Sequence, residues 1–177
     1  MNNTMKRYLA VLLICAGFLL SCGSAPSSTS SGSSTSSTVS PQTQAEIDRR
    51  QSIYMQYLRS EGYVPSIDKD NDILVKLDGS NFYILIGKSD PSFLTLLKPS
   101  IWSIKSDAER TKAANAVSYA NRSTKVAKAF LAGKNNEWVS LSAEMYVDDP
   151  NQFGLFFKRL IRMINNTGSE FETQMKM

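Results

Sequence analysis

The sequence predicts an α+β fold in which helices pack on an antiparallel sheet, in the order α-β-β-β(β)-α-β-β-α. Two observations lead to this prediction. Between residues 63 and 104, and again between 124 and 149, apolar side chains recur with a period of two, as they do in strands. Three other segments carry their apolar residues at helical spacing, so each would present one apolar side to the sheet.

The first helix is expected at about 43–61. Ser40 is a good N-cap and Pro41 suits the first helical position, whereas Gly62 is a natural C-terminal stop. The apolar stripe of this segment is one-sided, which is typical of a helix that lies on a core. Its members are Ala45, Ile47, Ile53, Tyr54, Tyr57 and Leu58.

Strands are expected near 63–67, around 73–77, around 82–86 and over 92–104, the last bent or ended near Pro99. Both faces of 73–86 are apolar, although a sheet with one face in water normally alternates apolar with polar residues. We therefore expect the second face, which includes Leu74, Tyr83 and Leu85, to be partly covered. The cover would be the next helix, a second subunit or a partner.

The second helix is expected to begin with a capping box, in which Ser106 is the N-cap and Glu109 is at the third helical position. It would run to about Asn121. Its inner face would consist of small residues that allow close packing, namely Ala113, Ala114, Val117 and Ala120.

Two further strands pair around the turn at 133–136. In the second of them, Trp138 and Tyr146 lie on the same side, opposite an apolar side that includes Val139 and Leu141. The last helix opens at Asp149 and carries a broad apolar stripe, and Gly168 is expected to break or fray its end. The stripe consists of Phe153, Phe156, Phe157, Leu160, Ile161 and Ile164.

The N-terminus resembles a bacterial lipoprotein signal over residues 1–21. Lys6 and Arg7 precede an apolar run of signal-peptide length, and the order "LLSC" places Cys22 directly after a peptidase site. An ordinary secretory signal followed by a chance cysteine is the alternative. An acylated Cys22 would anchor the chain to a bilayer, at the outer membrane and facing the periplasm. Residues 22–42, rich in Ser and Thr and free of charge, would be a disordered tether.

Composition excludes the commonest catalytic plans. The chain has no histidine, and its two cysteines are Cys15, within the signal, and Cys22. Without histidine, neither a Ser-His-Asp nor a Cys-His arrangement can form. Any enzyme here would have to use Asp, Glu, Lys, Tyr or Ser alone, which disfavours the remaining alternative of an unrecognised hydrolase. We expect no catalytic residues, no cofactor, no metal and no enzyme activity. Removal of the signal would lower the formal charge from +4 to +2, which does not indicate a nucleic-acid partner.

Residues 43–177 form the expected domain, and several separated patches in it resemble the YbjN-like family. The patches are "EGYVPSIDKDNDILVKLDGSNFYILI", "KPSIWSI", "ANRSTKVAKAFLAG" and "SAEMYVDDPNQFGLFFKRLIRMI". Together they span roughly 45–165. Members of this family are similar to the type III secretion chaperone-like fold. The resemblance implies that fold, a tendency towards protein binding and dimers, and no catalytic residues. Relatives often have glycine where this chain has Asn71, which also tolerates a left-handed conformation.

Three short motifs have a simpler interpretation than the chemistry they suggest. The aspartates at 68, 70 and 72 start like a calcium loop, but the later glycine and glutamate positions are wrong, so we expect a polar turn. Ser66 and Lys69 have the spacing of a penicillin-recognising nucleophile but lie in a strand-turn region. Asp148 and Asp149 are too close in sequence for a glycosidase pair, and a helix cap explains Asp149.

The sequence thus predicts a membrane-anchored lipoprotein with a non-catalytic, chaperone-like domain that binds an unidentified protein or a second copy of itself. The candidate binding or dimer face consists of Leu74, Tyr83, Leu85, Trp138 and Tyr146. A structural envelope protein is the alternative. It would contact lipid or cell wall through the basic stretch from Lys98 to Lys134, which has eight basic and two acidic residues.

Overall fold

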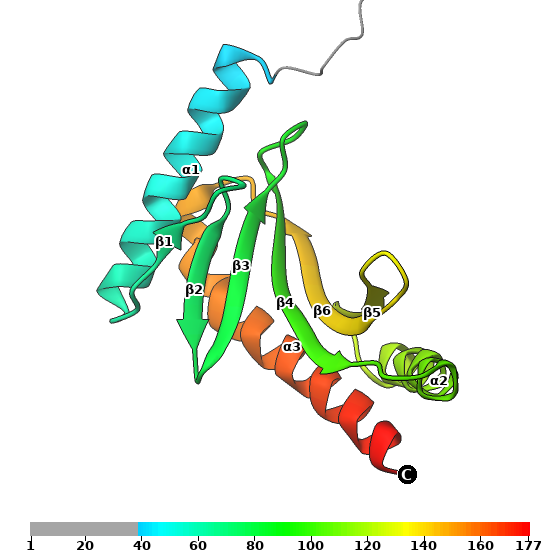
Figure 1. The fold of residues 1–177 in the computed structure, drawn as a ribbon. Helices are drawn as coiled ribbons and strands as arrows, with labels where there is room; N and C mark the ends of the chain where they lie inside the picture. Colours follow the sequence, from blue (N-terminus) through cyan, green and yellow to red (C-terminus); the bar gives the residue numbers. More distant parts are fainter. Residues whose placement is uncertain (1–38) are drawn as a thin grey trace, which may run out of the picture. The chain divides into compact units, whose positions relative to one another are not determined.

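The structure, a computed structural model, describes residues 39–177 (Figure 1). The expected lipoprotein signal, Cys22 and all but the end of the tether lie outside the described residues. The elements are α1 (Pro41–Ser60), β1 (Ser66–Ile67), β2 (Ile73–Leu77), β3 (Ser80–Ile86), β4 (Phe93–Ser103), α2 (Asp107–Ser123), β5 (Ala127–Ala132), β6 (Trp138–Tyr146), the 3-10 turn η1 (Pro150–Gln152) and α3 (Phe153–Lys176). This order confirms the predicted fold class.

The strands form one antiparallel sheet with the order β1-β2-β3-β4-β6-β5. β2 and β3 are joined by a two-residue turn, in which Asp78 and Gly79 have φ angles of 47° and 79°. Both angles are positive, as a tight hairpin turn of this kind requires. Asn71 also has a positive φ, of 68°, so asparagine fills the left-handed position as predicted.

α1 and α3 pack on one face of the sheet (Figure 1). Helix α1 begins at Pro41, two residues before the predicted start, because the Ser40 hydroxyl accepts a hydrogen bond from the Thr43 amide. The ring of Tyr54 stacks on Phe153 at the start of α3, with centroids 4.2 Å apart. The face of the sheet beneath the two helices supplies most of the buried apolar core. Its largest fully buried strand residues are Ile73, Phe82, Ile84, Leu94, Leu96 and Leu141.

A buried arginine fixes α1 to the end of β6. Arg50 is only 5% exposed, and its guanidinium donates to the carbonyl oxygens of Val147 at 2.5 Å and Asp148 at 2.9 Å. Its Nε also lies 2.6 Å from the Glu46 carboxylate, one helical turn away. Hydrogen bonds from a charged donor are among the strongest in proteins. Arg50 therefore holds the connection between β6 and α3 against α1.

Helix α2 begins as predicted, but its capping box is only half formed. The Ser106 hydroxyl accepts from the Glu109 amide at 3.1 Å. The Glu109 carboxylate does not return to Ser106; it accepts from the Lys105 amide at 2.6 Å and from the Trp102 indole at 2.8 Å. These two donors lower the pKa of Glu109, the Lys105 amide most strongly. Trp102 can bind the Glu109 carboxylate because it lies near the end of β4, which places its indole ring at the start of α2.

The small inner face of α2 differs by one residue from the prediction. Ala113, Ala116 and Ala120 are buried against β5 and α3, Val117 is half-buried, and Ala114 is exposed. The prediction of Ala114 was wrong. The buried side of α2 follows the spacing of three and four residues from Ala113, which leads to Ala116 and Ala120.

The end of α3 is the clearest correction. Gly168 does not break or fray the helix, which continues to Lys176 with Phe171 and Met175 buried. A Cβ atom at Gly168 would lie 3.0 Å from the Cδ1 of Leu141 in β6. The glycine therefore serves close packing of helix on sheet, and burial of the following turns outweighs its low helix propensity.

None of the described helices is long and apolar enough to cross a membrane.

Candidate binding surfaces

The sheet face turned away from α1 and α3 carries the predicted binding residues. We call it the open face and define it by Leu74, Tyr83, Leu85, Phe93, Leu97, Phe130 and Tyr146. These residues alternate along their strands with the core residues and so point to the other side. Four of the strands contribute directly neighbouring pairs, including Leu74 with Tyr83 and Tyr83 with Leu97. The result is an apolar strip from β2 to β4, which Ser142 and the Lys128–Glu144 pair separate from Phe130 on β5.

Exposure on the open face increases towards its β5 and β6 side. Leu74, Tyr83 and Leu85 are half-buried, whereas Phe130 is 37% and Tyr146 is 63% exposed. Tyr146 packs edge-on against Phe93, with ring centroids 5.2 Å apart. A tyrosine whose ring is apolar and whose hydroxyl is wet is typical of protein interfaces.

The middle of the open face is hollowed. A shallow depression of about 420 Å³ lies between β3, β4, β5 and β6. Leu85, Leu97 and Phe130 give it an apolar lining, and the ion pair of Lys128 with Glu144, at 2.8 Å, also lines it. An apolar hollow with a polar rim can receive a protruding side chain.

The structure groups four of the five predicted face residues and separates the fifth. Leu74, Tyr83 and Leu85 lie together, and Tyr146 is close to them through Phe93. Trp138 is at the opposite end of β6, where it pairs with Ser103 and Ala132. It is 40% exposed there and belongs to a different part of the surface.

Sequence reasoning missed Phe93, Leu97 and Phe130. The signal for the first two was present, because they alternate with the buried Leu94 and Leu96 in β4. Helix α2, one of the three covers considered from the sequence, does not lie on this face. It packs against β5 and α3, and its Asn121 borders the hollow.

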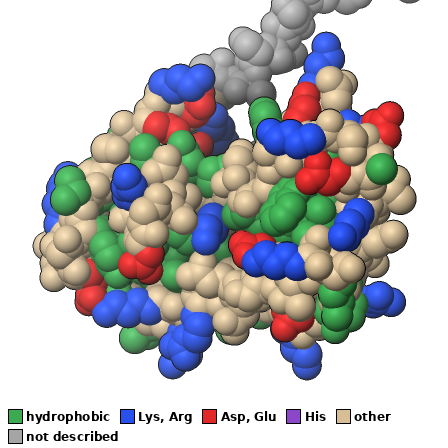
Figure 2. Space-filling model, turned by 60° about the horizontal axis from the view of Figure 1, so that its bottom comes forward, with side chains coloured by type: hydrophobic (Ala, Val, Ile, Leu, Met, Phe, Trp, Pro, Cys, Tyr) green, Lys and Arg blue, Asp and Glu red, His purple; other side chains and the backbone are tan. Residues whose placement is uncertain are grey.

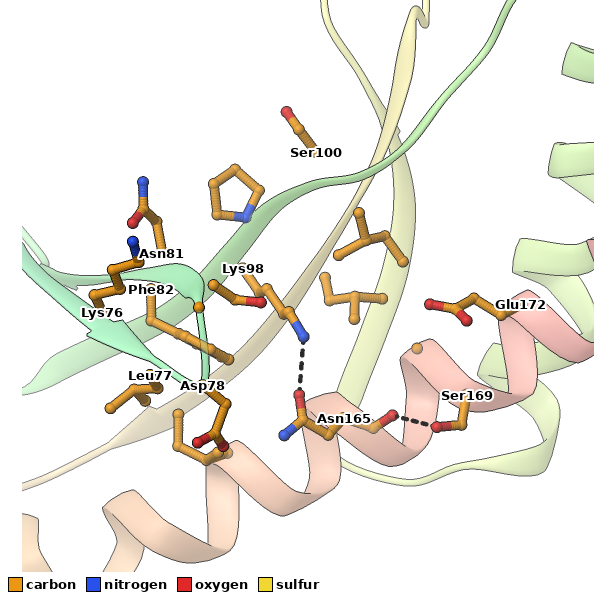
Figure 3. A pocket seen from close by; sticks show the side chains of 17 residues that line it. Lys76, Leu77, Asp78, Asn81, Phe82, Lys98, Ser100, Asn165, Ser169 and Glu172 are labelled. Carbon is orange, nitrogen blue, oxygen red and sulfur yellow. Dashed lines mark hydrogen bonds between the residues drawn. The ribbon is translucent and has the colours of Figure 1, made fainter.

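A second hollow opens between the end of the β2–β3 hairpin, β4 and the second half of α3 (Figure 3). We call it the β3–β4 cleft. Its volume is about 870 Å³. Lys98 crosses it, and its ammonium group donates to the Asn165 side-chain oxygen at 3.0 Å. This cleft lies on the helix-covered side of the sheet and is distinct from the open face.

The three short motifs have local structural roles. The Asp68 carboxylate accepts from the amides of Asp70 and Asp72, each at 2.9 Å, which is the predicted polar turn. Ser66 is in β1 and Lys69 is in the following turn, so neither is at a helix N-terminus. The Asp149 carboxylate caps η1 by accepting from the Asn151 amide at 3.0 Å. Within residues 39–177 no cluster of three metal-ligating side chains occurs.

In the basic stretch from Lys98 to Lys134, two of the eight basic residues have an acidic partner. Arg110 pairs with Asp107, and Lys128 pairs with Glu144. On the face shown in Figure 2, Lys and Arg side chains are interspersed with Asp and Glu. Acidic side chains among the basic ones weaken the positive potential that would attract a lipid headgroup or a polyanion.

No protein-family model matches the chain, and no curated protein matches it. Among solved structures, the chain is similar to YbjN from E. coli, with a TM-score of 0.54 and 15% sequence identity. The match covers 70% of this chain and 91% of YbjN, which carries a provisional description as a transcription regulator. At this identity the similarity concerns the fold. The chain therefore has a YbjN-like fold, as the sequence patches indicated.

Proposed function

We propose that this protein is a lipid-anchored, non-catalytic domain that binds another protein, or a second copy of itself, through the open face. The observation that carries the proposal is an apolar strip across a sheet face that no described helix covers. Half-buried leucines beside partly exposed aromatic rings make up this strip. Contiguous apolar surface of this kind is characteristic of interaction sites on soluble domains.

The residue types on the open face favour a protein as the ligand. Tyr83, Tyr146 and the two phenylalanines supply aromatic area, and the two charged residues that line the hollow, Lys128 and Glu144, pair with each other. Interface centres in protein complexes have this composition, whereas a polyanion would require a basic centre. The type III secretion chaperone-like fold implied by the sequence patches supports the same function.

Anchoring through Cys22 belongs to the same proposal. Two or three acyl chains would hold the protein stably at a bilayer, and the tether between the anchor and α1 would reach about 20–25 Å as a flexible coil. That distance clears the lipid headgroups and leaves the open face accessible in the periplasm. Cys22→Ser is expected to abolish incorporation of labelled palmitate and to leave the signal peptide uncleaved, so that the protein runs at a higher mass. Palmitate labelling of that variant would contradict the anchor.

The binding proposal is tested by pull-down of the full chain from detergent-solubilised envelope, with two matched variants. Leu85→Glu places a charge on the open face, and Leu155→Glu places one on α3, where Leu155 is 65% exposed and outside that face. We expect a partner, or a second copy, at near-stoichiometric amount with the unmodified chain and with Leu155→Glu. Leu85→Glu should lose it.

Equal recovery with both variants would refute the open face as the binding surface. Retention of the chain on purified lipid or cell wall, with no protein recovered, would favour the structural envelope role instead. Thermal melting of both variants shows whether either charge has unfolded the domain.

A further inference from the structure

The β3–β4 cleft exists because the ladder between these two strands stops early. β3 and β4 are paired from Ile86 and Leu94 to Tyr83 and Leu97, and no pair follows. Beyond this point β4 continues with β6 alone, through a register shift between Lys98 and Trp102. In Figure 1 the two strands diverge towards the hairpin end of β3, with α3 behind the gap.

A proline explains the separation. Continuing the register by two residues would place Asn81 opposite Pro99. Proline has no amide hydrogen, so it cannot donate to the carbonyl of a partner at that position. The next residue, Ser100, has a φ of 52°, and its amide donates to the Ser140 hydroxyl on β6 at 3.1 Å. The backbone of β4 is thus turned towards β6 and away from β3.

Asn81 is left with backbone groups that face the cleft. The two-residue turn makes Leu77 and Ser80 a hydrogen-bonded pair, so Phe82 is the next residue of β3 that bonds to β2. The intervening Asn81 points its amide and carbonyl to the other side, where β4 would have been. An unpaired strand edge of this kind can accept another extended chain.

The rest of the cleft offers both an apolar floor and a single partly buried cation (Figure 3). The half-buried Ile101 and Ile161 form the floor, to which the buried Phe82 and Leu141 add little accessible surface. The Lys98 ammonium lies 5.3 Å from the centre of the Phe82 ring, and within residues 39–177 Asn165 is its hydrogen-bond partner. Lysine has three donors, so an incoming carboxylate finds donors that the amide oxygen of Asn165 does not use.

We propose that the β3–β4 cleft binds an extended peptide segment of a partner protein that places one carboxylate on Lys98. The peptide would pair with the exposed backbone of Asn81 and lay an apolar side chain on the floor. Asp78, Glu172 and the exposed Lys76 also line the cleft, so Lys98 is the partly buried cation that a carboxylate would meet there. The cleft and the open face share none of their defining residues, so this inference stands apart from the proposed function.

The test selects random heptapeptides by messenger-RNA display on the full chain in detergent micelles. The enriched peptides should share one acidic position next to β-branched or aromatic residues. Binding of a fluorescein-labelled enriched peptide is then measured by anisotropy. Lys98→Gln is expected to weaken binding about tenfold or more, as loss of a charged hydrogen bond implies. Lys134→Gln, in the exposed turn between β5 and β6, should leave binding unchanged.

A second variant keeps the test valid if Lys98→Gln fails to fold. Asn165→Asp gives Lys98 a carboxylate of its own, so it should weaken peptide binding while leaving the melting temperature equal or higher. The fluorescein-labelled peptide is made with an amidated C-terminus, because display also blocks that end, so the carboxylate that binds belongs to a side chain.

Amide hydrogen exchange localises the peptide. We expect the Asn81 amide to exchange faster than that of Phe82 in the free protein and to become protected when the peptide binds. The proposal is overturned if no acidic position is enriched, if Lys98→Gln and Asn165→Asp bind normally, or if the Asn81 amide stays unprotected. Leu85→Glu should not affect the peptide, so failure of the open face and failure of the cleft are separate results.

Discussion

Arg50 offers the sharpest test of how the fold is held together. The proposed perturbation is Arg50→Met, which keeps a long apolar stem in a site where the arginine side chain is 6% exposed. The substitution removes two hydrogen bonds to backbone carbonyls at the end of β6. It leaves the Val147 carbonyl, whose residue is 3% exposed, without that donor.

The magnitude follows from these contacts. A hydrogen bond to a charged group contributes roughly 1.5–3 kcal/mol, and loss of a donor leaves a buried acceptor unsatisfied. Glu46 keeps Arg49 as a partner at 2.7 Å, so no isolated charge remains. We therefore expect the free energy of unfolding to fall by about 3 kcal/mol. For a domain of this size that lowers the melting temperature by about 10 °C.

The assay is urea denaturation, with Arg49→Met as the matched control. Arg49 pairs with the same glutamate, but its side chain is 51% exposed. Exposed ion pairs contribute little, so the control should change the unfolding free energy by less than about 1 kcal/mol. The reasoning is refuted if Arg50→Met is no more destabilising than Arg49→Met.

Three further predictions follow from the same structure. The pKa of Glu46 is lowered from 4.5 to about 2, mainly by its hydrogen bond from Arg49. The pKa of Glu46 is lower in the folded than in the unfolded state, so this stabilisation is present above pH 4.5 and is lost as the pH falls towards 2. Glu46→Gln should therefore make the free energy of unfolding depend less on pH between 4.5 and 2. An unchanged pH dependence in this variant would contradict the prediction. Asn121→Ala removes two hydrogen bonds to the Ala129 backbone, at 3.0 and 2.7 Å, and uncovers the outer edge of β5. We expect a loss of about 1–2 kcal/mol and self-association by light scattering, whereas Asn115→Ala, on the exposed side of α2, should show neither. Adding calcium should not shift the melting temperature, and a rise would show that the aspartate-rich turn between β1 and β2 binds the ion.

Local patterns carried most of the prediction of the fold. Strand positions in β2, β3 and β6 follow from the period of two, because a sheet with a buried face requires it. The start of α1 and of α2 follows from Ser40 and Ser106, since capping is a short-range hydrogen bond that residue type largely determines. The β2–β3 turn follows from Asp78-Gly79 for the same reason.

The features that could not be predicted depend on residues far apart in the sequence. The local sequence predicts that Gly168 ends the helix, but this glycine packs closely against Leu141 of β6. The local sequence predicts that Glu109 completes a capping box, but its carboxylate binds Trp102 of β4. In both cases tertiary packing overrides the local preference of the chain.

The candidate binding surfaces were also predictable from the sequence only in part. The apolar pattern on both faces of 73–86 indicated the face of Leu74, Tyr83 and Leu85. The pattern did not indicate that α2 would leave this face open. The β3–β4 cleft arises because a continued register would place Pro99 opposite Asn81, and register is a property of strand pairing. Pro99 alone indicated a bend in the strand but no opening.

The most direct test of the central claim, that the open face binds a protein, is site-specific photo-cross-linking in living cells. Benzoylphenylalanine would replace Tyr83 on the open face or, as a control, Tyr119 on α2, which is 39% exposed. We predict one discrete adduct from position 83, either twice the mass of the chain or that of a partner complex. It should disappear when Leu85→Glu is added, and position 119 should not form it. Equal adducts from both positions, or none from position 83, would contradict the account.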